Sequence, residues 1–569
     1  MMTPADAAFA RLAERYLDEV VPLSPVGATR LGDHRFDAEL DDVSPAARDQ
    51  AAKIYRALLA DVRKIPKAGL ARANQVDRQL LIKDLEHGLF ELEEVREWAW
   101  NPLVYTNLAG GALYGLIARD YAPLPRRLEA AASRMEKLPR FFEQVRRTLE
   151  PARVPRVHAE TAVQQNPGTL SIVTDGLRPA FKAAPPKLRA RLEKAAAALE
   201  VAVKAHQAWL EKTLLPAAKA DFRLGADLWE RRLSFVLDSP LGRAEIRKRA
   251  EAELERVHAD MLDASRKVLS RWEPAHVVPR APTKAERLAA IRAALEVVYR
   301  DLPDDARLVE VAREALRRTT DFVREKRLLS LPDDPIEIIV MPEFERGVAI
   351  AYCDSPGPLE SPSQRTFYAV APLPAAWTAD QKRSFLREYN LVSVDDLSIH
   401  EAMPGHHVQI AHANRYPSKL RALLASGSFI EGWAVYAERL MVDAGYRADD
   451  SRMRLVQLKW YLRSVTNALM DQDIHAGKLS EAEAMKLMTE QGFQQEREAA
   501  GKWRRALVTA TQLSTYFVGY QEHADLRAAA EKRAGKGFDP RAYHDRLLSF
   551  GSPPGRFARA LVLDEPIPE

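Results

Sequence analysis

Apolar residues recur at three- and four-residue spacing along most of the chain from Thr3 to Leu329. This period places them on one face of an α-helix. The pattern therefore predicts that residues 1–330 form a helical N-terminal lobe with a buried interior. His206 lies on the apolar stripe of the helix that begins after Pro185-Pro186, and we expect it to pack in the core rather than to bind a ligand. The segments with the clearest pattern are 46–62, 75–100, 125–149, 188–210, 241–268 and 284–300.

The pattern changes near Leu331, where short runs rich in β-branched and aromatic residues alternate with proline-containing loops. These runs predict strands at 335–341, 348–352 and 366–370, and one small sheet confined to about 335–371. Helical patterning returns after Trp377. The sequence therefore predicts a mainly α, multi-helix, two-lobed fold with a central cleft. Residues 331–569 form the second lobe, which is continuous with the first and carries the small sheet.

Charge and cysteine content exclude several classes of protein. The 84 basic and 80 acidic residues are interspersed and leave a net charge of +4, which argues against a dedicated nucleic-acid binder. Cys353 is the one cysteine, so there is no internal disulfide framework, and we expect it to pack rather than to act as a nucleophile. Residues 1–20 lack the apolar core of a secretory signal, and no run approaches the ~20 apolar residues of a membrane span. We expect a cytoplasmic protein; nothing in the sequence sets an oligomeric state.

The densest group of chemically reactive side chains is His400, Glu401, His406 and His407. In helix-borne zinc hydrolases, a His-Glu pair precedes a second His at i+4, so that both histidines share one helix face. Here the candidates stand at i+6 and i+7, and on an unbroken helix i+6 points about 120° away from i. Pro404-Gly405 lies between them and breaks the helical hydrogen-bond ladder, which would allow His406 to return beside His400. His407 could be the second ligand instead of His406. Alternatively, the motif binds no metal and is only the polar start of a helix.

A third ligand is available further along the chain. Glu431 lies 25 residues after His406, at the start of a predicted amphipathic helix over 429–438. Catalytic zinc takes three protein ligands and keeps a position open for water, and His400, His406 and Glu431 supply that set for one zinc per chain. Glu438 is seven residues after Glu431 on the same helix face, and we expect it to orient a ligand rather than to bind metal.

Other candidates lie in the last third of the chain. Asp471 and His475, spaced i and i+4, form either a unit that supports the metal site or contacts substrate, or a local pair at a helix end. A basic helix over 496–510 carries Lys502, Arg504 and Arg505, a candidate anchor for a carboxylate or for a structural acid. Tyr516 lies in the glycine-containing stretch that follows.

Several runs of residues resemble a known family. They are EYN (388–390), HEAMPGHHVQ (400–409), FIEGWAVYAE (429–438), KWRRA (502–506) and QLSTYFVGY (512–520), and they are similar to the bacterial family called domain of unknown function 885. That family resembles the helical zinc peptidases whose third ligand is glutamate, such as angiotensin-converting enzyme. The resemblance implies zinc on His400, His406 and Glu431, with Glu401 as general base and Tyr516 as a donor to the oxyanion.

Together these observations predict a zinc-dependent hydrolase, a metallopeptidase or carboxypeptidase-like enzyme that cleaves peptides with a zinc-activated water. An edge strand beside the metal helix would hold an extended substrate by strand addition. One alternative is a zinc hydrolase of a non-peptide amide or ester, because the same water activation serves either. The other is a non-catalytic helical scaffold, which would have no need of a base such as Glu401 beside the histidines.

Overall fold

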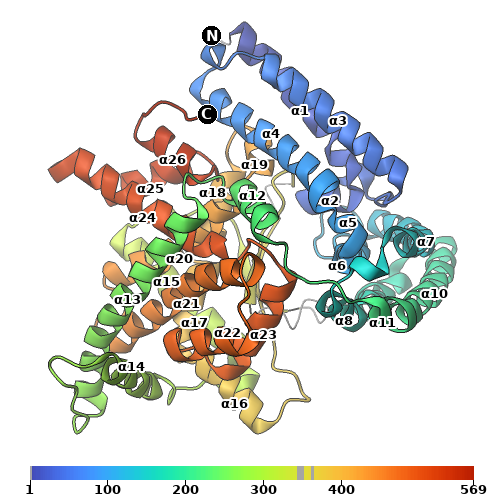
Figure 1. Ribbon diagram of the computed structural model, residues 1–569. Coiled ribbons are helices and arrows are strands. Elements are labelled where there is room, and N and C mark those ends of the chain that lie inside the picture. Colours follow the sequence, from blue (N-terminus) through green and yellow to red (C-terminus); the bar gives the residue numbers. More distant parts are fainter. Residues whose placement is uncertain (1–2, 342–350, 361–363) are drawn as a thin grey trace.

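A computed structural model of the chain describes residues 3–341, 351–360 and 364–569. The protein is mainly α-helical with one small sheet, as the sequence predicts (Figure 1). Among the described residues, none of the helices has both the length and the apolar character needed to cross a membrane.

The first part of the chain is helical throughout, as its periodicity predicts. Its α-helices are α1 (Pro4–Glu19), α2 (Pro25–Leu31), α3 (Pro45–Lys64), α4 (Arg72–Phe90), α5 (Glu97–Trp100), α6 (Pro102–Tyr114), α7 (Leu124–Thr148), α8 (Arg156–Gln165), α9 (Gly168–Ser171), α10 (Pro186–Trp209), α11 (Leu215–Ala217), α12 (Ala226–Leu237), α13 (Arg243–Trp272), α14 (Lys284–Val298) and α15 (Leu308–Lys326).

Local chemistry explains where these helices begin and end. The Ser44 hydroxyl accepts the N–H of Ala47 and caps α3, while Pro186, the second of the two adjacent prolines, is the first residue of α10. The helical pattern over 75–100 is confirmed, but the segment is not one helix. Arg96 adopts a left-handed φ of 54° and separates α4, with the π-helical turn Glu91–Val95 that follows it, from α5.

His206 is buried on α10 and packs against Phe142 and Trp209, with ring centroids 4.7 and 5.7 Å away. Burial lowers its pKa to about 3. The prediction that it is a core residue is therefore confirmed.

The sheet contains β1 (Ile336–Val340), β2 (Ala351–Asp354) and β3 (Thr366–Val370) in the order β1-β3-β2. β1 runs parallel to β3, and β2 runs antiparallel to it, with Cys353 opposite Tyr368. The predicted strand at 348–352 is represented by β2, which extends to Asp354; residues 348–350 lie outside the described part of the chain. Among the described strands, β2 lies at the edge of the sheet.

The chain after the sheet is again helical. Its α-helices are α16 (Ala379–Glu388), α17 (Leu391–Glu401), α18 (His406–Asn414), α19 (Lys419–Leu423), α20 (Gly427–Asp443), α21 (Ser451–His475), α22 (Glu481–Lys486), α23 (Glu496–Val508), α24 (Ser514–Ala534), α25 (Pro540–Leu548) and α26 (Gly555–Val562).

The apolar core consists of several clusters. One joins α1, α3 and α4, and a second joins α6, α7 and α10, which form the upper and right-hand parts of Figure 1. The largest cluster extends from Trp229 to Leu563 and so includes residues on both sides of position 330. The last residue contacts the segment between α3 and α4, since Lys67 Nζ lies 2.6 Å from Glu569 Oε1. The division into lobes at 330 and the central cleft stay predictions.

Helices α20 and α24 cross at two glycines. A Cβ on Gly432 would lie 2.2 Å from the carbonyl carbon of Gly519, and a Cβ on Gly519 would lie 1.8 Å from the backbone carbonyl oxygen of Ser428. Only glycine permits this approach. It brings the first turn of α24, with Tyr516, against the part of α20 that carries Glu431.

Candidate metal centre

The helix carrying His400 ends immediately after it, as the Pro-Gly pair predicts. Asn390 caps the start of α17, its side-chain oxygen accepting the N–H groups of Val392 and Ser393 at 3.1 Å. At the other end the chain turns, and the Gly405 N–H donates to the carbonyl of Ile399 at 2.9 Å. α18 then starts at His406, which therefore returns toward α17.

Gly405 makes this turn possible. A Cβ on this residue would lie 1.9 Å from the carbonyl oxygen of His400, far inside van der Waals contact with backbone that cannot easily yield. No other residue fits the turn that returns His406 to His400.

Gly405→Ala is expected to destabilise the protein by about 1–3 kcal/mol or more and to lower its zinc content, because the turn must open and carry His406 away. Thermal unfolding and metal analysis of the same preparation measure both effects. Gly501→Ala is the matched control: Gly501 lies inside α23, and a Cβ added there would meet no described atom within 4 Å, so alanine should stabilise by about 0.5–1 kcal/mol. Unchanged stability and zinc content in Gly405→Ala would contradict this account of the turn.

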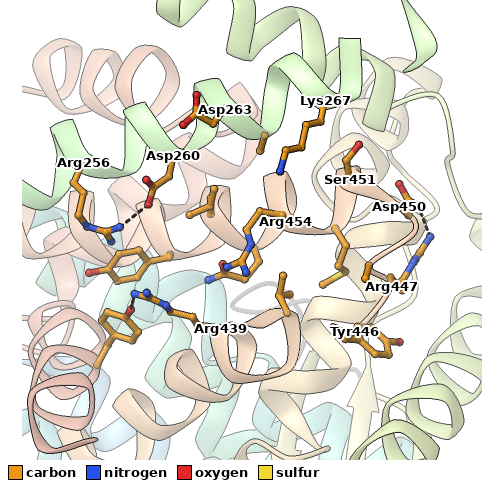
Figure 2. Close-up of a pocket in the computed structure, with 18 residues that line it drawn as sticks. Arg256, Asp260, Asp263, Lys267, Arg439, Tyr446, Arg447, Asp450, Ser451 and Arg454 are labelled. Carbon is orange, nitrogen blue, oxygen red and sulfur yellow. Dashed lines mark hydrogen bonds and ion pairs between the residues drawn. The ribbon is translucent and has the colours of Figure 1, made fainter. Parts of the chain in front are cut away.

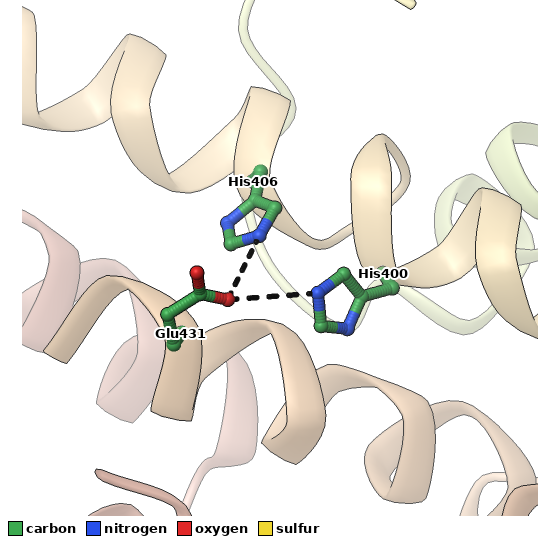
Figure 3. A group of neighbouring side chains, drawn as sticks. All are labelled: His400, His406 and Glu431. Carbon is green, nitrogen blue, oxygen red and sulfur yellow. Dashed lines mark ion pairs between the residues drawn. The ribbon is translucent and has the colours of Figure 1, made fainter. Parts of the chain in front are cut away.

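Three side chains converge where α17, α18 and α20 meet (Figure 3). His400, His406 and Glu431 each contribute one ligand atom, and these atoms all lie within 4.8 Å of one another. Glu431 Oε2 is 3.8 Å from His400 Nε2 and 3.4 Å from His406 Nε2. The two imidazole rings are nearly perpendicular, with centroids 4.8 Å apart.

The electrostatics favour an ionised carboxylate in this cluster. Burial by itself would raise the pKa of Glu431, but the two neighbouring imidazoles lower it well below its usual range. Two imidazole nitrogens and one carboxylate oxygen are a donor set that divalent zinc takes in catalytic sites. The residues therefore fit the metal that the motif predicts.

Glu438 fixes the orientation of His400. Its Oε1 lies 2.6 Å from His400 Nδ1, so the imidazole donates that N–H to the carboxylate and directs Nε2 toward Glu431. A carboxylate in this position holds a metal-binding histidine in the correct tautomer and increases its basicity. Glu438 thus occupies the orienting position that its spacing from Glu431 predicts.

Asp396 is a site residue that the sequence reasoning missed. It lies one turn before His400 on α17 and is buried, and neither carboxylate oxygen has a hydrogen-bond partner among the described residues. Burial and the adjacent charge of Glu438 raise the pKa of Asp396 well above its usual range. The i, i+4 spacing places Asp396 and His400 on one helix face, and this spacing could have indicated from the sequence that Asp396 lies near the site.

Glu401 is buried beside the cluster without joining it. Its Oε2 accepts the backbone N–H of Cys353 at 3.0 Å, so the edge strand β2 holds the carboxylate in place. Burial raises the pKa of Glu401, as suits a group that takes up a proton. No sequence signal reveals this contact, because Cys353 contributes a backbone group. Burial also raises the pKa of the Cys353 thiol, in agreement with a packing role.

His407 does not belong to the group of converging side chains. It is fully buried, it is not one of the residues whose ligand atoms meet, and burial lowers its pKa to about 4. Of the two adjacent histidines, the fold brings His406 to His400 and Glu431.

Tyr516 and Arg505 lie close enough to Glu431 for its charge to act on both side chains. Tyr516 Oη accepts N–H groups from Arg505 Nη2 and Gln512 Nε2, both at 3.2 Å. Burial and the negative charge of Glu431 raise the pKa of the Tyr516 phenol. Because two donors already occupy the oxygen, the phenol proton remains to be donated to another acceptor.

Asp471 and His475 contact neither the cluster nor each other by a hydrogen bond. Asp471 accepts the backbone N–H groups of Thr511 and Ser514 at 3.0 and 3.1 Å, and His475 Nε2 donates to the carbonyls of Ala506 and Thr509. The end of α21 therefore holds the segment that leads into Tyr516.

A separate pocket of about 390 Å³ lies between α13, α20 and α21 (Figure 2). None of the three converging side chains lines it. Its arginines are largely paired with acids: Arg256 lies 2.5 Å from Asp260, and Arg447 lies 2.8 Å from Asp450.

Comparisons with known proteins agree with the family that the motifs indicate. The model of a family described as bacterial protein of unknown function (DUF885) matches residues 25–562. A solved structure of a "putative lipoprotein of unknown function" from Shewanella oneidensis is 30% identical, with a TM-score of 0.81, and the match covers 98% of this chain and 99% of that one.

A "putative lipoprotein" from Colwellia psychrerythraea has the same fold, with a TM-score of 0.78, 16% identity and 99% coverage of both chains. No curated protein matches the chain. The extent of the family match and the identity to the Shewanella protein lead to one conclusion: this chain belongs to the bacterial DUF885 family.

Proposed function

We propose that the protein is a zinc-dependent hydrolase that cleaves peptides. The observation that supports this most strongly is the convergence of His400, His406 and Glu431 beside a second carboxylate, Glu401, that is held apart from them by a backbone N–H. A site that only stored metal would have no use for this separate, buried base.

The three converging residues would hold one zinc ion through His400 Nε2, His406 Nε2 and the Glu431 carboxylate. When bound, zinc supplies a Lewis acid that lowers the pKa of a water molecule toward neutrality. Three protein ligands leave a coordination position open, as catalytic zinc requires. This is the ligand set that the resemblance of the motifs to helical zinc peptidases implies.

Glu401 and Tyr516 would carry the proton transfers and the charge stabilisation. Glu401 takes a proton from the attacking water and returns it to the leaving amine, with its carboxylate held by the Cys353 N–H. Tyr516 donates a hydrogen bond from its phenol O–H to the oxygen of the scissile carbonyl as negative charge develops there. Arg505 and Gln512 orient the phenol for this donation.

The position of β2 supports an extended peptide as substrate. β2 lies at the edge of the described sheet and contacts Glu401 through Cys353. An extended chain can bind beside such a strand with its backbone near the metal centre. We also propose a cytoplasmic location, on the basis of the single cysteine; the lipoprotein names apply to the two structural relatives.

Incubation of the zinc-loaded protein with a mixed peptide pool, followed by mass spectrometry, tests the function. We expect new peptide termini that are absent from the metal-free protein. Cleavage of simple esters or non-peptide amides without any peptide cleavage would instead favour the alternative substrate class. No hydrolysis of any of these would favour a non-catalytic scaffold.

Tyr516→Phe is expected to lower kcat by about 10²–10³, with zinc content and substrate affinity nearly unchanged, because the lost donor acts on charge present only in the transition state. Steady-state kinetics and the melting temperature are measured on one preparation. Tyr520→Phe is the matched control, since the Tyr520 hydroxyl accepts from Arg439 instead. A normal kcat in Tyr516→Phe would remove this residue from the mechanism.

A further inference from the structure

A buried ionic network next to the metal centre contains more cations than anions. Helices α16, α21 and α23 bring together six charged side chains that are largely withdrawn from water. The cations are Lys459, Arg463, Lys502 and Arg505, and the carboxylates are Glu388 and Glu498.

The two carboxylates are already taken up by two of the cations. Lys459 Nζ lies 2.8 Å from Glu388, and Arg463 bridges the two acids, at 2.6 Å from Glu498 and 3.4 Å from Glu388. Glu388 also accepts the backbone N–H of Gln495 at 3.0 Å. This part of the network is therefore charge-balanced and hydrogen-bonded.

Neither Lys502 nor Arg505 forms an ion pair with an acid among the described residues, although the charge of Glu431 acts on Arg505 and that of Glu498 acts on Lys502. They lie three residues apart on α23 and so share one helix face. Arg505 donates to the neutral oxygens of Gln512 and Tyr516, at 2.9 and 3.2 Å. Lys502 is only 8% exposed, and within the described part of the chain no carboxylate lies within 4.0 Å of its ammonium group.

A charged ammonium group without a close counter-ion is costly in the interior, and burial lowers the pKa of Lys502 well below its usual range. A bound anion would favour the charged form of this side chain. Both cations are on the Tyr516 side of the metal centre, because Arg505 contacts the phenol that we place at the scissile carbonyl. A guanidinium presents paired N–H donors that match a carboxylate, and an adjacent ammonium adds a third donor. A substrate carrying a carboxylate would complete the network.

We propose that Lys502 and Arg505 bind a carboxylate of the substrate, which is either its C-terminal carboxylate or an acidic side chain close to the scissile bond. This inference rests on the proposed peptidase function and narrows its substrates to anionic peptides. A C-terminal carboxylate would make the enzyme an exopeptidase, and an acidic side chain would make it selective for aspartate or glutamate.

Calorimetric binding to the zinc-loaded Glu401→Gln protein tests the inference without turnover. Four pools of otherwise uncharged hexapeptides are compared: free acids, C-terminal amides, amides with one glutamate at each position in turn, and the same amides with glutamine. We expect either the free acids to bind about 10- to 100-fold more tightly than the amides, or the glutamate pool to bind that much more tightly than the glutamine pool.

Lys502→Met in the same Glu401→Gln protein should lower the affinity for the preferred pool to within a few-fold of the affinity for its uncharged counterpart. Lys502→Arg should restore the preference. Arg504→Met is the control, since Arg504 is the exposed neighbour on α23, 3.9 Å from Glu160. The comparison of pools needs no variant at position 502, so it stands even if Lys502→Met does not fold.

Equal binding of charged and uncharged pools would overturn the carboxylate anchor and leave the peptidase proposal intact. A preference that survives Lys502→Met in folded protein would likewise overturn it. Failure to bind any peptide would overturn the proposed function, and the anchor with it.

Discussion

Glu401→Gln is expected to retain zinc and to lose activity by about 10²–10⁴ or more, because glutamine cannot accept the proton of the attacking water. The substitution is nearly isosteric, and the amide oxygen can still accept the Cys353 N–H that holds the carboxylate in the native protein. Fold and metal content should therefore be preserved. Single-turnover rates on the peptide pool, with zinc determined on the same sample, separate loss of the base from loss of the metal.

Glu522→Gln is the matched control for this experiment. Glu522 on α24 is another glutamate with buried side-chain oxygens, and burial raises its pKa to about 7, but it does not contribute to the metal centre. Its replacement should leave turnover close to that of the native protein. If Glu401→Gln also turns over within a few-fold of the native rate, Glu401 is not the base.

His400→Ala and Glu431→Ala are expected to abolish stoichiometric zinc binding and, with it, all metal-dependent activity. Each removes one of only three protein donors, and the remaining two cannot hold a catalytic zinc ion. Equilibrium dialysis against zinc, followed by metal analysis, measures the loss directly.

Glu438→Gln provides a graded comparison, because Glu438 orients His400 without joining the converging atoms. It should weaken zinc binding by about 10- to 100-fold rather than abolish it. Full zinc occupancy in Glu431→Ala would show that the third ligand has been assigned wrongly.

The sequence predicts those features of this fold that depend on periodicity and local backbone chemistry. The apolar spacing finds most helices of the first 330 residues, and the β-branched runs find β1 and β3. It does not show the break within 75–100, where the left-handed Arg96 interrupts an apolar pattern that continues on both sides. Periodicity reports which face is buried and contains no information about such a break.

In the candidate site, too, the sequence predicts local features but not those that depend on tertiary contacts. Pro404-Gly405 indicates that the helix must break, but spacing could not rank His406 above His407, because their order depends on how Gly405 packs against the His400 carbonyl. The contact between Glu401 and the Cys353 N–H is made by a backbone group 48 residues away and leaves no trace in side-chain identity. That Lys459 and Arg463 take up the two acids and leave Lys502 and Arg505 without an ion pair likewise appears only once α16, α21 and α23 are assembled.

Zinc content of the native protein and of His406→Ala and His407→Ala, measured side by side after reconstitution, tests the central claim most directly. We predict about one zinc per chain in the native protein and in His407→Ala, and almost none in His406→Ala, because the turn at Gly405 directs only His406 to His400 and Glu431. Zinc retained in His406→Ala and lost in His407→Ala, or no zinc in the native protein, would contradict the proposed metal centre.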